Sequence, residues 1–155
     1  ALWTDLTPTF SGRFDQVDGF GIDPLPVNRP IPIWVGAGGG LGKPGPREAL
    51  LRRIGRLSDG WFAVVPSPQV AGMHAQIREH ALDAGRDPDA IGFEGGIGMA
   101  GNTNEEWLGR LHDWRRAGAS HGCLRTLDGG LDANAQLALM QESHRVVVGE
   151  GLSLA

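Results

Sequence analysis

The sequence predicts an α/β protein built as the C-terminal half of a (β/α)8 TIM barrel. Four short apolar runs predict the strands, at residues 33–36, 60–65, 91–99 and 122–127. An amphipathic, helix-like stretch follows each run, at residues 47–58, 68–84, 104–117 and 133–147. Strands that alternate with helices indicate parallel pairing, because a parallel pair needs a long crossover connection. A complete barrel of this kind needs roughly 250 residues, whereas the chain has 155.

The chain divides into three segments by its pattern. Residues 1–32 contain a possible hairpin around Ser11 and Gly12, followed by four prolines that force an extended approach to the first strand. We interpret this segment as an N-terminal excursion that leads into the first strand of the barrel, and not as a separate domain. Residues 33–148 form the four βα units, and residues 149–155 form a C-terminal tail.

The predicted helices carry their own start signals. Ser67 followed by Pro68 is typical of an N-cap with proline in the first helical position. Thr103 and Glu106 have the spacing of a capping box, and Asp132 is placed to cap the last helix. These signals support four separate helices.

Composition excludes several classes of function. A net charge of -4 gives no electrostatic footprint for nucleic acid or an anionic membrane. No apolar run approaches the roughly 20 residues that cross a bilayer, so we expect a cytoplasmic protein without membrane contact. Cys123 is the single cysteine, which excludes an internal disulfide, and its position in a predicted strand favours a core residue. The histidines lack metal-ligand spacing, so no metal site is predicted.

Two glycine-rich loops are candidates for binding phosphate. The first begins at the end of the first predicted strand with Gly36, Ala37, Gly38, Gly39 and Gly40. Glycines between a strand and a helix N-terminus let backbone N–H groups approach an anion, although a plain connecting loop has the same composition. The second loop contains Gly129 and Gly130, after the last predicted strand.

A Rossmann-like nucleotide binder is a weaker alternative. Gly40, Gly42 and Gly45 satisfy the G-x-G-x-x-G pattern literally. The first of these glycines does not sit at the strand end, however, and Pro44 interrupts the turn.

Two charged residues are predicted to face the inside of the barrel. Glycines alternate along one face of the third predicted strand and surround Glu94. Arg125 lies near the C-terminal end of the next strand, where a barrel mouth is expected. The two side chains either form a structural ion pair or contact an anion or a flavin.

Several segments together resemble the luciferase-like monooxygenase superfamily. They include RPIPIWVG at 29–36, ALLRR at 49–53, LSDGW at 57–61 and TLDGGL at 126–131. The likeness extends over nearly the whole chain, and it looks closest to the branch of oxidoreductases that use the deazaflavin coenzyme F-420.

The resemblance implies strands five to eight of a barrel that holds a reduced flavin or deazaflavin, FMN or coenzyme F-420. Hydride transfer to a small-molecule substrate, or oxygen activation, would occur at that ring system. The cofactor-binding candidates are Gly36, Ala37, Gly38, Gly39, Gly40, Glu94, Arg125, Gly129 and Gly130. No catalytic residue is assigned.

The sequence accounts for only four of the eight βα units of a barrel, and this limits the activity that we expect. We expect the chain to be inactive until the barrel is complete, and a non-catalytic half-barrel or assembly module is the alternative. Four parallel strands also leave two unpaired edges and an uncovered face. We therefore expect a homo-oligomer, most simply a dimer, or a partner chain that carries the missing strands.

Overall fold

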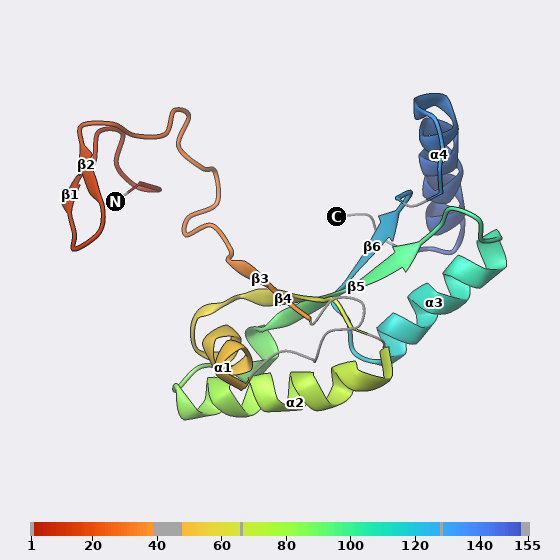
Figure 1. Ribbon diagram of the computed structural model, residues 1–155, viewed down its shortest axis with the longest axis horizontal. Helices are drawn as coiled ribbons and strands as arrows, with labels where there is room; N and C mark the ends of the chain where they lie inside the picture. The colour runs from red at the N-terminus through yellow and green to blue at the C-terminus, as the bar shows by residue number, and fades with distance from the viewer. Residues whose placement is uncertain (1, 39–47, 66, 128, 153–155) are drawn as a thin grey trace. The chain divides into compact units, whose positions relative to one another are not determined.

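A computed structural model describes residues 2–38, 48–65, 67–127 and 129–152 (Figure 1). The chain separates into two compact units, Ala1–Ile33 and Trp34–Ala155.

The first unit is built around a two-stranded hairpin. Strands β1 (Thr9–Ser11) and β2 (Gln16–Asp18) pair antiparallel, with Thr9 opposite Asp18. The N–H of Gly12 donates to the carbonyl of Asp15 across the turn, at 2.9 Å. The hairpin predicted around Ser11 and Gly12 is therefore confirmed.

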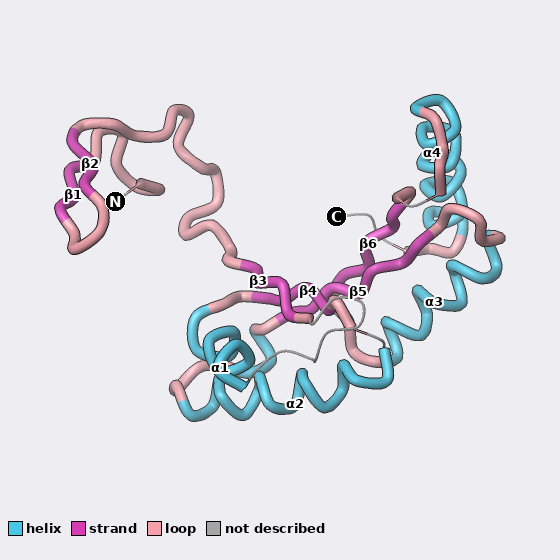
Figure 2. Tube along the Cα trace, in the orientation of Figure 1, coloured by secondary structure: helices cyan, strands magenta, loops and turns pink. Residues whose placement is uncertain are grey.

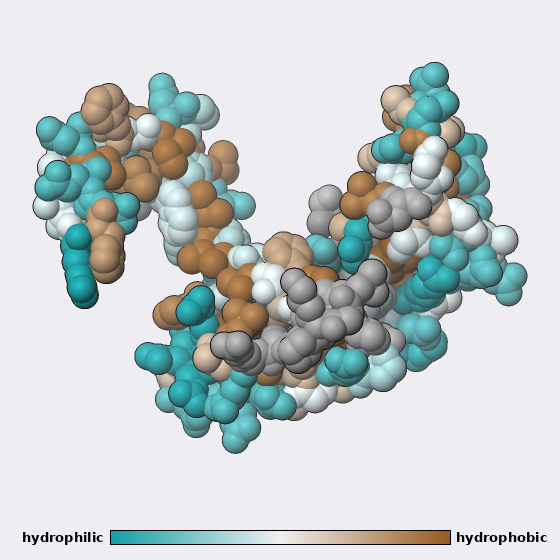
Figure 3. All heavy atoms as spheres, in the orientation of Figure 1, coloured by the Kyte–Doolittle hydropathy of each residue, from teal (hydrophilic) through white to brown (hydrophobic). Residues whose placement is uncertain are grey.

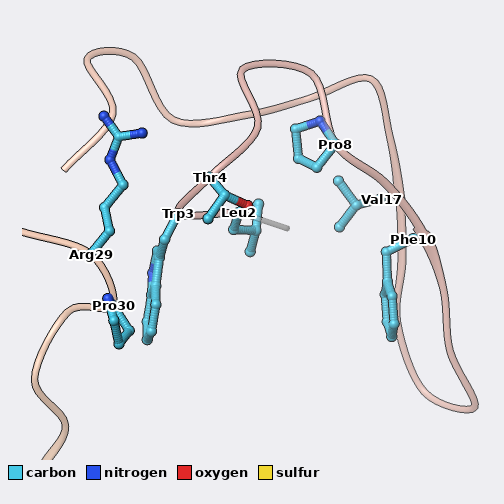
Figure 4. A pocket seen from close by; sticks show the side chains of 8 residues that line it. All are labelled: Leu2, Trp3, Thr4, Pro8, Phe10, Val17, Arg29 and Pro30. Carbon is cyan, nitrogen blue, oxygen red and sulfur yellow. The ribbon is translucent and has the colours of Figure 1, made fainter.

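Most apolar side chains of the first unit are exposed, as the brown surface in Figure 3 shows. Among its described residues, only Pro8 is buried, while Phe14, Phe20 and Val27 are the most exposed large hydrophobics. An apolar hollow of about 470 Å³ lies within the unit, and Figure 4 shows Trp3 beside Pro30 on one wall. A segment this short buries too little apolar surface to form a core of its own.

The second unit alternates strands and helices. Its strands are β3 (Trp34–Ala37), β4 (Gly60–Ala63), β5 (Gly92–Gly98) and β6 (His121–Arg125). Its helices are α1 (Glu48–Leu57), α2 (Ser67–Asp83), α3 (Asn104–Arg116) and α4 (Ala133–Gly149), with a 3-10 turn, η1, at Pro88–Ala90. The strands form one parallel sheet in the order β3-β4-β5-β6.

The sheet topology confirms four consecutive units of a (β/α)8 barrel. Strand order follows chain order without a reversal, so the described sheet lacks the switch point of a doubly wound nucleotide-binding fold. The Rossmann-like alternative is therefore wrong for this sheet. Its proposed loop, from Gly40 to Gly45, lies outside the described residues.

Helices α1, α2 and α3 lie along one side of the sheet, and the core forms between them and it (Figure 2). Alternate residues of each strand point to this side, as period-two geometry requires. Trp61, Phe93 and Ile97 are fully buried from the strands, and Ile54, Ile77 and Trp107 from the helices. The ring centroids of Trp61 and Phe93 are 5.5 Å apart on neighbouring strands.

Helix α3 packs closely on the sheet because β5 has a glycine beneath it. A Cβ placed on Gly95 would lie 2.1 Å from Cδ2 of Trp114. The indole therefore rests directly on the strand backbone, and both Trp107 and Trp114 are buried, as their helical stripe predicts.

Two of the predicted caps are confirmed. The N–H of Glu106 donates to Thr103 Oγ1 at 3.3 Å, and the N–H of Thr103 donates to Glu106 Oε2 at 2.7 Å. These reciprocal bonds form the capping box. Asp132 Oδ1 accepts from the N–H of Ala135 at 2.8 Å at the start of α4. The side chain of Ser67 lies outside what the structure describes.

His74 is held in its neutral form against the core. The Trp61 indole N–H donates to His74 Nδ1 at 3.3 Å, and the rings of His74 and Phe93 have centroids 4.8 Å apart. Burial lowers the pKa of His74 from 6.5, and the positive charge of Arg78 lowers it further. Protonation would remove the acceptor that the Trp61 indole uses.

The close contact at Gly95 gives a stability prediction. We expect Gly95→Ala to lower the free energy of unfolding by about 1–3 kcal/mol, because the methyl group displaces Trp114. Gly109→Ala is the matched control, since a Cβ there meets nothing within 4 Å on helix α3. That change should raise stability by up to ~1 kcal/mol. Urea denaturation followed by circular dichroism measures both, and equal effects would contradict the packing described.

His74 gives a pH prediction. Its pKa is lower in the folded chain than in the unfolded chain, so the unfolded chain binds more protons below 6.5. Stability is therefore fully present above that pH and is lost as the pH falls toward the folded pKa. His74→Asn keeps an acceptor for Trp61 but does not titrate. Between about pH 7.5 and about pH 5.5, the variant should lose less unfolding free energy than the wild type in urea melts. If the variant and the wild type lose the same unfolding free energy over this range, titrating groups other than His74 cause the pH dependence.

Candidate functional site

The candidate site is the face of the sheet opposite the helices. The parallel register orders its residues in layers from the N-terminal to the C-terminal ends of the strands. Trp34, Gly60 and Gly92 form the first layer, and Gly36, Phe62, Glu94 and His121 form the second. Cys123 lies beside Gly96 in the third, and Arg125 beside Gly98 in the last. Active sites of (β/α) barrels lie at the C-terminal ends of the strands, so the later layers are the candidate layers.

An aromatic group covers the N-terminal end of this face. The Trp34 indole lies across the strands, so that a Cβ on Gly60 would be 2.4 Å from its Cε2 atom. It meets the His121 ring edge-on at a centroid distance of 4.9 Å, and the Phe62 ring at 5.5 Å. These three rings form a floor, which we call the Trp34 floor. It separates the open layers above from the N-terminal side of the sheet.

Arg125 lies across the face rather than away from it. A Cβ on Gly96 would be 1.1 Å from Nη2 of Arg125, so the guanidinium group occupies the space that this glycine leaves. The prediction that Arg125 faces the inside of the barrel is confirmed. The glycines around Glu94 therefore have a structural function: the missing side chain at Gly96 leaves room for the guanidinium group of Arg125 from the neighbouring strand.

The structure does not pair Glu94 directly with Arg125. Among the ion pairs of the described residues, none joins the two, and Cys123 lies between them. The expected structural ion pair is therefore wrong. The carboxylate of Glu94 instead acts on the Cys123 thiol, whose pKa its negative charge raises. The guanidinium group of Arg125 lies over Gly96 instead.

The surroundings of Cys123 favour the protonated thiol over the thiolate. Burial raises its pKa, and the carboxylate of Glu94 raises it further, while Arg125 opposes the shift. Because the thiolate is the nucleophilic form, this environment does not suit a nucleophile. The sequence-based expectation of a core residue is wrong, because Cys123 is half-buried on the face opposite the helices and lies outside the hydrophobic core.

The C-terminal edge of the face is open at two glycines. A Cβ on Gly36 or Gly98 would meet nothing within 4 Å, whereas Gly38 lies against Val64. Ala37 belongs to the opposite face and is fully buried in the core, while its carbonyl accepts from the N–H of Val64 at 3.0 Å. Gly39 and Gly40 lie outside the described residues. Of the predicted first loop, Gly36 and Gly38 are thus the described residues on the candidate face.

The loops after β5 and β6 meet at the same edge. A Cβ on Gly129 would lie 2.3 Å from that of Ala100, so the two loops are in close contact. Gly130 has a φ of 61°, which favours glycine. Asn102 donates to the carbonyl of Gly98 at 3.2 Å and accepts from Arg110 at 2.8 Å. The sequence analysis missed this Asn102–Arg110 pair, although the turn ahead of Thr103 was a signal for it.

The residues described here form no cluster of three or more metal-ligating side chains. Within the same part of the chain, no helix is long and apolar enough to span a bilayer. Among the described strand residues of the face, Glu94 and Arg125 are charged, and His121 lies at the floor.

Comparison with known proteins identifies the family. A family model described as luciferase-like monooxygenase matches residues 1–144, and the chain belongs to this family. None of the curated proteins is significantly similar to it in sequence.

A solved structure supports the fold. An F-420-dependent secondary alcohol dehydrogenase, in complex with an F-420-acetone adduct, is similar with a TM-score of 0.62 and 16% identity. The match covers 94% of this chain and 58% of the dehydrogenase, so the chain spans little more than half of that protein. Riboflavin lyase, with modified FMN and riboflavin, has a TM-score of 0.44 and 19% identity over 71% of this chain and 23% of its own.

The Cys123 environment gives a reactivity prediction. Glu94→Gln removes the negative charge that raises the pKa of the thiol, so the thiolate fraction should grow. We expect iodoacetamide to alkylate Cys123 several-fold faster in this variant at neutral pH, by mass spectrometry. Glu105→Gln, an exposed carboxylate in the first turn of α3, is the control and should leave the rate unchanged. An unaltered rate in Glu94→Gln would contradict the contact.

Proposed function

We propose that this chain supplies four βα units to the barrel of a flavin- or coenzyme F-420-dependent oxidoreductase. The observation that carries the proposal is the open face above the Trp34 floor. This face combines space at Gly36 and Gly98 with the cation of Arg125. Family membership and the name of the structurally similar dehydrogenase support the same cofactor class.

The residues of this face fit such a cofactor. A flat ring system needs positions without protruding side chains, and Gly36 of β3 and Gly98 of β5, where a Cβ would meet nothing within 4 Å, provide them. The phosphate groups need cations and free backbone N–H groups, for which Arg125 and the loop after β6 are placed. Gly36, Gly38, Gly98, Gly129 and Arg125 would hold the cofactor, which supplies a hydride to a small-molecule substrate when bound in its reduced form.

The other residues of the face would orient the bound molecules and exclude water. The Trp34 floor closes the N-terminal end with three rings, so a ligand above it is shielded from that side. The protonated thiol of Cys123 gives a neutral wall between Glu94 and Arg125. In the described part of the second unit, helices α1, α2 and α3 cover the opposite side of the sheet, so we propose that catalysis requires four further βα units around this face.

A binding experiment tests the proposal. Reduced FMN and, separately, reduced coenzyme F-420 are titrated anaerobically into the protein while ligand absorbance and fluorescence are followed. We expect micromolar binding of at least one of them. Arg125→Gln removes the cation and should weaken binding roughly tenfold, the loss of one charge-assisted contact. Gly98→Val fills the open space with a side chain and should also weaken binding.

The matched control is Gly72→Val, because this glycine on α2 also meets nothing within 4 Å but lies off the face. Its affinity should equal that of the wild type. If the assembled wild-type protein binds neither cofactor, the non-catalytic half-barrel is the better description.

A further inference from the structure

The loop between β5 and α3, residues 99–103, is held by two side chains at the edge of the candidate face. The side-chain amide of Asn102 donates to the carbonyl oxygens of Gly98 and Ala100, at 3.2 Å in each case. Its Oδ1 atom accepts from Nη2 of Arg110 at 2.8 Å. Nη1 of Arg110 donates to the same Gly98 carbonyl at 3.5 Å. We call Asn102 and Arg110 the loop clamp.

The loop clamp is satisfied in one orientation of the Asn102 amide. Its nitrogen faces two carbonyl oxygens, and its oxygen faces the guanidinium group of Arg110. A flipped amide would place its oxygen against the two carbonyl oxygens and its N–H groups against other N–H donors. A network with a single satisfied arrangement specifies the conformation of the loop that carries it.

Arg110 reaches the loop from the second turn of α3. Side chains on a helix point toward its N-terminus, so the Arg110 side chain extends back over the first turn. Hydrogen bonds from Thr103 lower the pKa of Glu106 in that turn, and the positive charge of Arg110 adds to the shift. Arg110 therefore joins α3 both to the end of β5, at Gly98, and to the loop that follows, at Asn102.

The clamped loop also contacts the parts of β6 that the proposed function uses. The N–H of Met99 donates to the carbonyl of Arg125 at 2.9 Å. The Cβ atom of Ala100 would lie 2.3 Å from a Cβ on Gly129. A hydrogen bond and direct packing thus connect this loop to the end of β6 and to the loop after it. A change in the position of residues 99–103 would therefore disturb both Arg125 and Gly129.

We propose that Asn102 and Arg110 are positioning residues, which hold the loops after β5 and β6 as one ordered edge of the cofactor site. The loop clamp acts through Gly98, Ala100 and the groups that they support, without touching the cofactor. An edge that is already ordered loses less conformational entropy when a ligand binds, so the clamp raises affinity. The role in cofactor binding rests on the proposed function, whereas the ordering of the edge needs no ligand.

Hydrogen exchange of the cofactor-free protein gives the first test. Arg110→Gln removes the guanidinium group, so peptides that cover residues 99–103 and 129–131 should exchange several-fold faster than in the wild type, by mass spectrometry. Arg116→Gln is the matched control, because Arg116 is an exposed arginine in the last turn of α3, where it pairs with Asp113. Its exchange rates in both segments should equal those of the wild type. Unchanged exchange in Arg110→Gln would overturn the proposal.

Asn102→Asp tests the same network without removing a cation. The aspartate keeps the size of the side chain and the acceptor for Arg110, but it places an oxygen against the carbonyls of Gly98 and Ala100. Residues 99–103 should again exchange several-fold faster, while peptides from helix α2 exchange at the wild-type rate. Equal acceleration in α2 would indicate general loosening of the fold and overturn a local role for the clamp.

Cofactor affinity connects the loop clamp to the site. Arg110→Gln and Asn102→Asp should each bind reduced FMN or reduced coenzyme F-420, whichever the wild type binds, several-fold more weakly. Arg110→Lys keeps the charge but not the planar fork of donors, so its affinity and its loop exchange should fall between those of the wild type and Arg110→Gln.

The two readouts together separate positioning from direct contact. Weaker binding with unchanged loop exchange would show that Arg110 contacts the cofactor itself, and faster exchange with unchanged affinity would show that the edge does not affect binding. Either result would overturn the positioning role. If the wild type binds neither cofactor, the proposed function fails, and the exchange rates still decide whether the clamp orders this edge.

Discussion

The arrangement of this protein depends on the parallel register of its four strands, because that register sends large side chains to one face and glycines to the other. In β4 and β5 the register puts Trp61 beside Phe93 under the helices. The same register puts Phe62 beside Glu94 on the opposite face. A slip of one residue would exchange the two faces completely. The tight core and the open site are therefore two results of one pairing.

The sequence was sufficient to predict the elements and their order. Period-two and helical patterns are local, so they placed all four strands and helices, and the capping box at Thr103 and Glu106 marked the start of α3 correctly. The position of Arg125 on the inner face also followed from alternation along β6. These features depend on neighbours in the chain, which a single sequence displays directly.

The features that sequence reasoning missed depend on contacts between strands. The Trp34 floor joins β3, β4 and β6, because the small residues at Gly60 and Gly92 let the indole cross the sheet. The register places Cys123 beside Gly96, so Cys123 lies between Glu94 and Arg125. Knowing only that the two charged residues are on adjacent strands does not show that they are four residues out of register. Ala37 was counted with its glycine neighbours although alternation turns it into the core. In each case the missing information was the register.

The same face links the site to assembly. A glycine-lined sheet gains little stability from its inner side, because glycines bury almost no side-chain area. The large side chains that remain there, Phe62 and Val64, are left exposed to solvent. A ligand that covers the Trp34 floor and further strands that close the ring would both remove this apolar surface from water. Closure would also place a second wall across from Arg125, and removing water strengthens the attraction between a cation and an anion. Burying this face therefore has two favourable effects. It removes apolar surface from water, which favours a complete barrel, and it strengthens the attraction between Arg125 and an anionic cofactor.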